Sequence, residues 1–317
     1  MPLSVLICTH NPRRDFLNRT LAALRVQTLP LADWEIILVD NASATPVATQ
    51  FDVSWHPRAR IVVETTLGLT PARLRAIQEA TTDLLVFVDD DNVLAPDFLA
   101  EAVRLAAAHP FLGAFGCSIR ADYEKAPEGE ARNWTWLLTV GEFEHARWSN
   151  LGVAGGDVFT LPSGAGLVIR TNVAREYAKL ATSDPLRASL DRRGADLTGS
   201  GDRDLAATSI RLGLGTGKFP SLKLDHLMSA GRVDPAYLIR LAEATAYGET
   251  ILNFLHGLPW QPIPQSRTRR WLDAWERRHL DPLARELREA HARGKARAIT
   301  MLQSLPAEQR NAVNALV

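Results

Sequence analysis

Four short runs of apolar residues, separated by helical patterns, constrain the fold of this chain more than any other feature. The runs are LSVLIC (3–8), WEIILVD (34–40), ARIVVE (59–64) and DLLVFV (83–88). Their length suits fully buried strands, and they lack the alternation of polar and apolar residues typical of a half-exposed strand. Helical patterns occupy residues 14–27, 71–80 and 96–108. This alternation predicts a parallel sheet covered on both faces, a doubly wound half-domain over residues 1–115.

The pattern is less regular after residue 115. We expect further strands at 112–119, 165–170 and 221–226, and helices at 171–181, 203–212, 235–257 and 266–302. The insert between the first two of these strands has three tryptophans and few periodic signals, which is typical of a functional or mobile segment. We therefore predict an α/β fold with a Rossmann-like, mixed but mainly parallel sheet flanked by helices. Its domain spans residues 1–233, in halves 1–115 and 116–233, and a helical extension spans 234–317.

Composition excludes several classes of protein. The 317 residues carry 36 acidic and 36 basic side chains, so no overall charge favours nucleic acid or a membrane. No stretch approaches about 18 uncharged apolar residues, and the N-terminus lacks a signal-peptide pattern. Cys8 and Cys117 lie in apolar runs, which indicates buried free thiols in a reducing compartment. We expect a cytoplasmic protein that does not bind nucleic acid.

Polar side chains stand where the predicted strands end. They are Thr9, His10 and Asn11 after the first strand, Asp40 and Asn41 after the second, and Asp89, Asp90 and Asp91 after the fourth. Ligands of an open parallel sheet bind beyond these carboxyl ends. Taken singly, Asp40 suits a turn and His10 an ordinary loop. Together these residues predict a polar site at one edge of the sheet.

Three consecutive aspartates after a buried strand require a neutralising partner, because adjacent carboxylates raise one another's pKa. Asp89 and Asp91 are two residues apart, so in extended backbone they point to the same side. Mg²⁺ and Mn²⁺ prefer such oxygen ligands, often together with substrate phosphates. The pattern favours a metal–diphosphate site. A solvated acidic turn at the start of the next helix is the alternative.

Five segments resemble, in their order along the chain, those of family 2 glycosyltransferases. They are LSVLICTHN, EIILVDNAS, TTLGLTPARLRAIQEATTDLLVFVDDDNVLAPDFL, LPSGAGLVIR and GDRDLAATSIRLGLG. The likeness covers about residues 1–230, and the ordered set is more specific than any single member. It implies the GT-A fold, a nucleotide-sugar-binding architecture, and an enzyme that transfers a sugar from a nucleoside-diphosphate sugar.

The resemblance also assigns residues to the donor. The implied donor-binding residues are Thr9, His10, Asn11, Asp40, Arg73, Asp89, Asp90 and Arg232. Thr9 and His10 would line the nucleobase pocket. Asp40 would accept the base N–H, which favours uracil or thymine over cytosine because a carboxylate accepts but cannot donate. The metal, Mn²⁺ or Mg²⁺, would bind Asp91 and Asp89 of an Asp-x-Asp motif, with His226 completing its shell.

The segment GSGDRDLAATSIRLGLG (199–215) resembles the part of the family that supplies the catalytic base, commonly a Glu-Asp pair. Asp202 matches the aspartate, whereas Gly201 stands where the glutamate is expected. Asp202 would remove the proton from an acceptor hydroxyl as it attacks the anomeric carbon. Two alternatives remain open: Asp204 is the base, or Asp202 is only the N-cap of the following helix.

The resemblance implies that the sugar moves from a UDP-linked donor to a saccharide or lipid-linked acceptor with inversion at the anomeric carbon. The 120–163 insert would cover the site. Helices of the extension would contact a membrane surface or a second copy of the chain.

Two alternative functions remain. One is a non-catalytic nucleotide-sugar-binding module, which the glycine at position 201 favours, and the other is a sugar nucleotidyltransferase. The latter usually needs a glycine-rich loop after the first strand, where this chain has THNPRR. A nicotinamide-binding protein is disfavoured because no G-x-G-x-x-G follows that strand.

Overall fold

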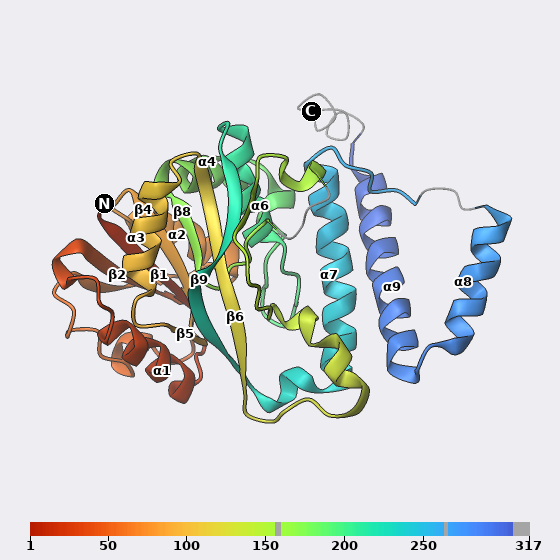
Figure 1. Ribbon diagram of the computed structural model, residues 1–317, viewed down its shortest axis with the longest axis horizontal. Coiled ribbons are helices and arrows are strands. Elements are labelled where there is room, and N and C mark those ends of the chain that lie inside the picture. The colour runs from red at the N-terminus through yellow and green to blue at the C-terminus, as the bar shows by residue number, and fades with distance from the viewer. Residues whose placement is uncertain (156–159, 263–265, 307–317) are drawn as a thin grey trace.

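One mixed sheet runs through the part of the chain that the computed structural model describes, residues 1–155, 160–262 and 266–306. Within these residues nine strands are paired in the order β3-β2-β1-β4-β8-β6-β9-β5, with β7 added beside β9 (Figure 1). The strands are β1 (Leu3–Thr9), β2 (Trp34–Asn41), β3 (Ala59–Glu64), β4 (Leu84–Asp89), β5 (Asn92–Leu94), β6 (Leu112–Tyr123), β7 (Arg147–Ser149), β8 (Leu167–Arg170) and β9 (Gly215–Met228).

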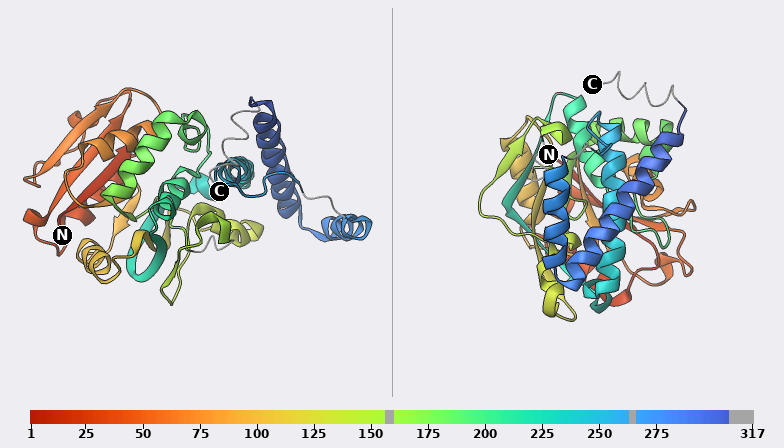
Figure 2. Two further views of the ribbon diagram at one scale, coloured as in Figure 1. Left: turned by 90° about the horizontal axis from the view of Figure 1, so that it is seen from above. Right: turned by 90° about the vertical axis from the view of Figure 1, so that its right-hand side faces the viewer.

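Helices cover both faces of this sheet (Figures 1 and 2). In the domain they are α1 (Arg14–Arg25), α2 (Leu69–Glu79), α3 (Phe98–Ala108), α4 (Thr171–Ser183), α5 (Pro185–Ala188) and α6 (Gly201–Arg211). Short 3₁₀ turns are η1 (Leu31–Asp33), η2 (Val47–Thr49), η3 (Gly129–Leu138), η4 (Gly152–Gly155) and η5 (Ala230–Val233). Apolar residues of α1 and α3 pack on one face, and those of α2, α4 and α6 on the other. The prediction of a mixed α/β sheet flanked by helices is confirmed.

Each central strand contributes to both hydrophobic cores, which explains its continuous apolar sequence. In β4, Val86 and Val88 belong to the core beneath α1 and α3, whereas Leu85 and Phe87 belong to the opposite core. Successive side chains of a strand point to opposite faces, so a strand buried on both faces needs apolar residues throughout. Cys8 and Cys117 are free thiols, as expected; Cys117 is buried and Cys8 is half-buried.

The register of the parallel strands brings the predicted strand-end residues side by side. Thr9 of β1 lies opposite Asp40 of β2, and Cys8 lies opposite Asp89 of β4. On the other side of the sheet, β5 runs antiparallel to β9 and pairs Asn92 with His226. The strand pairing thus places His226 beside the acidic segment, although the two are far apart in sequence.

The predicted C-terminal extension is helical, and consists of α7 (Pro235–Leu255), α8 (Arg267–His279) and α9 (Pro282–Ser304). α7 packs against α9, where Gly294 lies so close that an added Cβ would stand 2.0 Å from the carbonyl oxygen of Glu243. The helix expected over 266–302 is two helices, because Pro282 starts α9 and the Asp281 side chain caps it at Ala284 N. α8 stands apart from α9 along most of its length in Figure 1 and in the left view of Figure 2, and an ion pair of 3.7 Å between Glu276 and Arg288 connects them. No helix in the described ranges is long and apolar enough to cross a bilayer.

A buried carboxylate on β2 predicts how stability depends on pH. Glu35 Oε2 pairs with Arg60 at 2.8 Å, and Oε1 accepts hydrogen bonds from the Ser4 and Thr81 hydroxyls. Burial opposes ionisation of Glu35, but these partners together lower its pKa from 4.5 to about 2. Because the folded pKa is the lower one, the stabilisation is complete above the unfolded pKa and is lost as pH falls from about 4.5 toward 2.

We therefore expect acid to remove about 3 kcal/mol of the free energy of unfolding through this group, since one pKa unit is worth about 1.4 kcal/mol. Chemical denaturation at pH 7 and at about pH 3 measures the loss in the wild type. In Glu35→Gln the loss between pH 7 and pH 3 should be smaller by about 2 kcal/mol, because pH 3 lies about 1.5 units below the unfolded pKa and still above the folded one. An identical pH dependence in the two proteins would contradict this assignment.

Candidate active site

A cleft of about 310 Å³ opens where β1 and β4 end. Most residues that the sequence placed in a site line this cleft: Thr9, His10, Arg73, Asp89, Asp90, Asp91, Asp202, His226 and Arg232. Two expected residues, Asn11 and Asp40, lie beside the cleft but are not among its lining residues. Asn41, which the sequence analysis placed at the strand ends, also lines the cleft, as do Asp191 and Arg192, which it did not name.

His10 and Asn11 form one hydrogen-bonded unit at the end of β1. The Asn11 amide lies 2.9 Å from His10 Nε2, and His10 Nδ1 lies 2.7 Å from the carbonyl oxygen of Asn41. These contacts are satisfied when the amide donates to Nε2 and Nδ1–H donates to the carbonyl. Asn11 Oδ1 also accepts the backbone N–H of Ala44 at 2.8 Å. Asn11 therefore orients the His10 ring and holds the turn that follows β2. Because its side chain is used in these two contacts, it does not line the cleft.

Asp40 has the turn-forming role that the sequence left open. Its Oδ1 accepts the N–H of Ser43 at 3.1 Å, and its Oδ2 accepts the N–H of Val47 at 2.9 Å. Its neighbour Asn41 lines the cleft and accepts the N–H of Gly68 at 2.8 Å. Consecutive strand residues point to opposite faces, so these two side chains separate at the end of β2. Recognition of a base by Asp40 stays a prediction.

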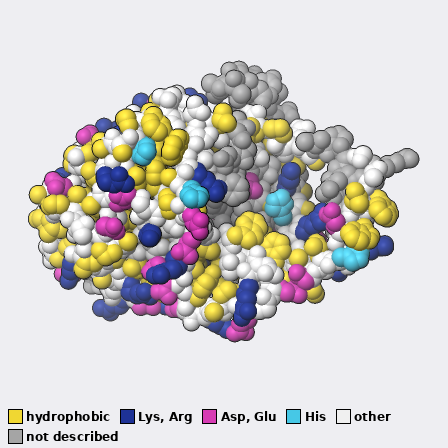
Figure 3. All heavy atoms as spheres, viewed as in Figure 1, with side chains coloured by type: hydrophobic (Ala, Val, Ile, Leu, Met, Phe, Trp, Pro, Cys, Tyr) yellow, Lys and Arg dark blue, Asp and Glu magenta, His cyan; other side chains and the backbone are white. Residues whose placement is uncertain are grey.

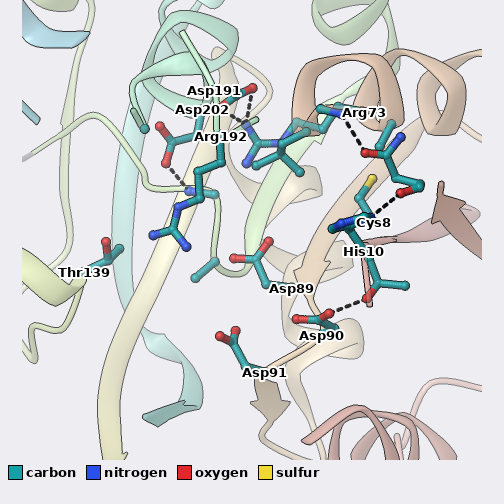
Figure 4. A pocket seen from close by; sticks show the side chains of 18 of the residues that line it. Cys8, His10, Arg73, Asp89, Asp90, Asp91, Thr139, Asp191, Arg192 and Asp202 are labelled. Atoms are coloured by element: carbon teal, nitrogen blue, oxygen red, sulfur yellow. Dashed lines mark hydrogen bonds and ion pairs between the residues drawn. The ribbon is translucent and has the colours of Figure 1, made fainter. Parts of the chain in front are cut away.

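Asp89, Asp90 and Asp91 crowd one side of the cleft (Figure 4). Burial and then the neighbouring carboxylate of Asp91 raise the pKa of Asp89, and the same causes raise the pKa of Asp90 to about 7. Thr9 donates its hydroxyl to Asp90. Asp91 differs, because a histidine and an arginine face it: His226 Nε2 lies 3.3 Å from Oδ1, and Arg232 Nη2 lies 2.8 Å from Oδ2. Although burial acts against it, His226 and Arg232 lower the pKa of Asp91 to about 2.

The side chains around the acidic segment supply only some of the ligands that a divalent cation needs. In the described parts of the chain, no three Asp, Glu, His or Cys side chains converge so that they could hold an ion by themselves. Mg²⁺ in nucleotide sites takes one or two carboxylates and completes its shell with phosphate oxygens and water. Asp91 and Asp89 offer that number, and buried His226 Nδ1 has no hydrogen-bond partner among the described residues. The residues therefore fit an ion that is shared with a diphosphate.

Two basic residues enter the cleft from opposite sides. Arg73 of α2 is buried, and its Nη1 lies 3.0 Å from both carboxylate oxygens of Asp191. Arg192 points into the space between Asp202 and Asp89 (Figure 4), and it has no ion pair with another described residue. Asp191 and Arg192 belong to the loop SLDRRGAD, whose only sequence signal is its cluster of charges. Their position depends on the backbone bond from Leu69 N to Arg192 O, of 3.0 Å.

Asp202, the predicted base, lies in the first turn of α6 and lines the cleft opposite the three aspartates (Figure 4). Its Oδ2 accepts the N–H of Gly164 at 2.6 Å. Ser200, rather than Asp202, is the N-cap residue of α6. Asp204 is fully buried, pairs with Arg187, and has His256 Nε2 at 2.8 Å from its Oδ1. The geometry thus favours Asp202 over Asp204 as the carboxylate that faces a substrate.

A second hollow of about 270 Å³ shares Asp202 with the cleft. One wall is η3, where Trp136 is 62% exposed, and another wall is α7 of the C-terminal extension. α7 contributes Tyr237, Leu241, Thr245 and Glu249. Their spacing of four residues places them on one face of the helix. Residues 156–159 of the insert expected to cover the site lie outside the described residues.

The fold and this constellation of residues define a class of protein, the glycosyltransferases with the GT-A fold. Residues 4–160 match the family "Glycosyl transferase family 2". The chain therefore belongs to the family 2 glycosyltransferases, as the sequence motifs indicated.

Relatives and solved structures agree with this assignment. Validoxylamine A glucosyltransferase of Streptomyces hygroscopicus subsp. jinggangensis is 35% identical over 112 residues, which is 34% of this chain and 26% of that protein. The mannosyltransferase PcManGT of Pyrobaculum calidifontis, in complex with GDP-Man and Mn²⁺, superposes with a TM-score of 0.52 at 19% identity, covering 99% of this chain and 78% of that one. S. aureus TarS 1–349 with UDP gives 0.51 at 14% identity, covering 95% and 90%. The aligned segments make up only 14%, 35% and 26% of three curated relatives.

Proposed function

We propose that the protein is a metal-dependent, inverting glycosyltransferase that moves a sugar from a UDP-linked donor to the hydroxyl of a saccharide or lipid-linked acceptor. The observation that carries this proposal is the position of Asp202. It faces the three aspartates across the cleft and also lines the second hollow. A base between two neighbouring binding spaces is what transfer to an acceptor requires, whereas a nucleotide-binding module needs only the first space.

The donor diphosphate would lie between the acidic segment and Arg192. Asp91 and Asp89 would hold Mn²⁺ or Mg²⁺ together with His226, and that ion would supply Lewis-acid charge to the leaving diphosphate. Arg192 adds a positive charge from the other side of the cleft (Figure 4). Charge that builds on the leaving group is stabilised best by groups already in place, which an arginine fork provides.

The acceptor would approach through the second hollow. Asp202 accepts the proton of the acceptor hydroxyl, and the N–H of Gly164 fixes the orientation of its carboxylate. Attack from the side opposite the diphosphate inverts the anomeric carbon. Trp136 offers an exposed aromatic face, and the pair of Arg203 with Glu249 (2.8 Å) offers polar atoms to hydroxyl groups. This lining supports a saccharide as the acceptor.

The exposed residues of α8 support the contact expected of the C-terminal helices. Trp271, Leu272 and Trp275 are 66%, 38% and 52% exposed, and hydrophobic side chains are visible at that end of the molecule (Figure 3). Exposed aromatic and apolar residues that gather on one helix are typical of interaction surfaces. Contact of this helix with a lipid surface or a second copy of the chain stays a prediction.

A thermal-shift screen of nucleotide sugars, each with and without Mn²⁺, tests the proposed function. A ligand that binds only the folded state raises the melting temperature, and at a hundredfold excess over its Kd the gain is about 2.7 kcal/mol. For a chain of this size we expect a rise of roughly 5 °C with UDP-sugars in Mn²⁺, and a smaller rise without the metal.

Product analysis separates the rivals. Release of UDP from a UDP-sugar supports a transferase, whereas binding without release indicates a nucleotide-sugar-binding module. Formation of a nucleotide sugar and pyrophosphate from a nucleoside triphosphate and a sugar phosphate would identify a nucleotidyltransferase. If no nucleotide sugar shifts the melting temperature in either condition, the proposal fails.

A further inference from the structure

Asp191 is a buried carboxylate at the junction of three segments. Both of its oxygens lie 3.0 Å from Arg73 Nη1, and Oδ2 accepts the Thr70 hydroxyl at 2.9 Å. Two backbone hydrogen bonds fix its own loop: Leu69 N donates to Arg192 O at 3.0 Å, and Ser200 N donates to Leu190 O at 2.8 Å. The loop is thereby tied to the start of α2 and to the start of α6.

Gly201, the first residue of α6, lies directly against this carboxylate. A Cβ added at Gly201 would stand 2.4 Å from Asp191 Oδ2 and 2.5 Å from its Cγ. The carboxylate of Asp191 therefore occupies the space that a side chain at position 201 would need. This is the position where the family resemblance leads one to expect an acidic residue and where the chain has glycine. The structure brings an acidic group to that place from another segment.

Arg73 connects Asp191 to the proposed base. A Cβ added at Gly164 would stand 2.6 Å from Arg73 Nη2 and 3.4 Å from Asp202 Oδ2, so Gly164 lies between these two side chains. The N–H of Gly164 is the group that holds Asp202. Without Asp191, the buried guanidinium of Arg73 would lose its ion-pair partner and would move or recruit water. Either change displaces the Gly164 loop, and with it the carboxylate of Asp202.

We propose that Asp191 is a positioning residue that replaces the acidic side chain expected at position 201 and, through Arg73 and Gly164, fixes Asp202 for proton transfer. The inference rests on the proposed function. It makes glycine at 201 and aspartate at 191 a matched pair. An exchange of the two residues, Asp191→Gly with Gly201→Asp, keeps the composition and moves the carboxylate across the same gap.

Three variants of the full chain test this inference. UDP release from UDP-sugars in Mn²⁺ measures kcat, and calorimetry measures the Kd for UDP. Asp191→Asn keeps the shape of the side chain, and we expect kcat to fall about 10- to 100-fold, because small displacements of a catalytic group have effects of that size. The Kd for UDP should stay within about threefold, since Asp202 acts on the acceptor. The exchange variant should recover kcat to within about fivefold of the wild type.

The control is Glu35→Gln, which weakens a carboxylate–arginine pair at the other end of β2, away from the cleft. The carboxylates of Glu35 and Asp191 are equally buried (3% exposed), although Arg60 is 33% exposed and Arg73 only 5%. It should lower the melting temperature while leaving kcat unchanged. An unchanged kcat in Asp191→Asn, or an exchange variant that folds but recovers no activity, would overturn the inference. If no UDP-sugar is turned over at all, the proposed function fails separately. The melting temperatures then still test whether aspartate at 191 and glycine at 201 are matched. The melting temperature of Asp191→Asn should be roughly 5–10 °C below that of the wild type, and that of the exchange variant should recover most of this difference.

Discussion

Asp202→Asn is expected to lower the turnover of UDP-sugar by about 10²- to 10⁴-fold, the usual contribution of a general base. The amide oxygen of asparagine can still accept the N–H of Gly164, which Asp202 Oδ2 accepts at 2.6 Å in the wild type. The N–H of Arg203, which Asp202 Oδ1 accepts at 2.8 Å in the wild type, loses its acceptor. The variant should therefore lose the ability to take a proton together with this one local hydrogen bond. Rates of UDP release measure the effect on kcat, and calorimetry with UDP should give a Kd within about threefold of the wild type.

Asp204→Asn provides the matched control two residues further along α6. Asp204 is fully buried against Arg187 and His256 and is not part of the cleft lining. Its replacement should destabilise the fold, because it weakens a buried charge pair, while kcat in the folded protein stays near that of the wild type. If Asp204→Asn abolishes turnover and Asp202→Asn does not, the base has been assigned to the wrong residue.

The N-terminal half of the fold was predictable because its signals are local. β1 and β4 are buried on both faces, and a continuous apolar run records that environment directly. The later strands were only partly predictable. β6 reaches Tyr123 and β9 begins at Gly215, beyond the expected ranges 112–119 and 221–226. The outer end of β6 is exposed or half-buried, so its pairing with β9, rather than an apolar pattern, determines its length.

The residues of the site likewise divide into those with a local sequence signal and those placed by contacts between distant segments. Residues at strand ends were found because the order of parallel strands brings those ends together. Asp191 and Arg192 were missed as site residues because backbone hydrogen bonds between distant segments position their loop, and no local periodicity reports such bonds. Asp40 and Asn41 differ by one position along β2, yet only Asn41 reaches the cleft. Sequence alone located the end of the strand but did not determine which of the two side chains faces the ligand.

Asp91→Asn is expected to weaken binding of UDP in the presence of Mn²⁺ by about 100-fold, at a cost near 2.7 kcal/mol. Asp91 is the member of the acidic triplet that faces His226 at 3.3 Å and Arg232 at 2.8 Å. Replacing its carboxylate by an amide removes the charge that both the metal and Arg232 require. Titration of UDP by calorimetry in Mn²⁺, and again in EDTA, measures the metal-dependent part of the affinity.

Asp90→Asn is the control within the same triplet. Asp90 accepts the Thr9 hydroxyl, and burial and its neighbours raise its pKa to about 7, so an amide changes its charge least. We expect the Mn²⁺-dependent affinity for UDP to fall by less than about tenfold in this variant. The EDTA titrations should then give nearly equal affinities for wild type, Asp90→Asn and Asp91→Asn, because the difference among them lies in the metal. If Asp90→Asn and Asp91→Asn lose the same affinity for UDP in Mn²⁺, the acidic segment acts by its total negative charge, and Asp91 is not a specific metal ligand.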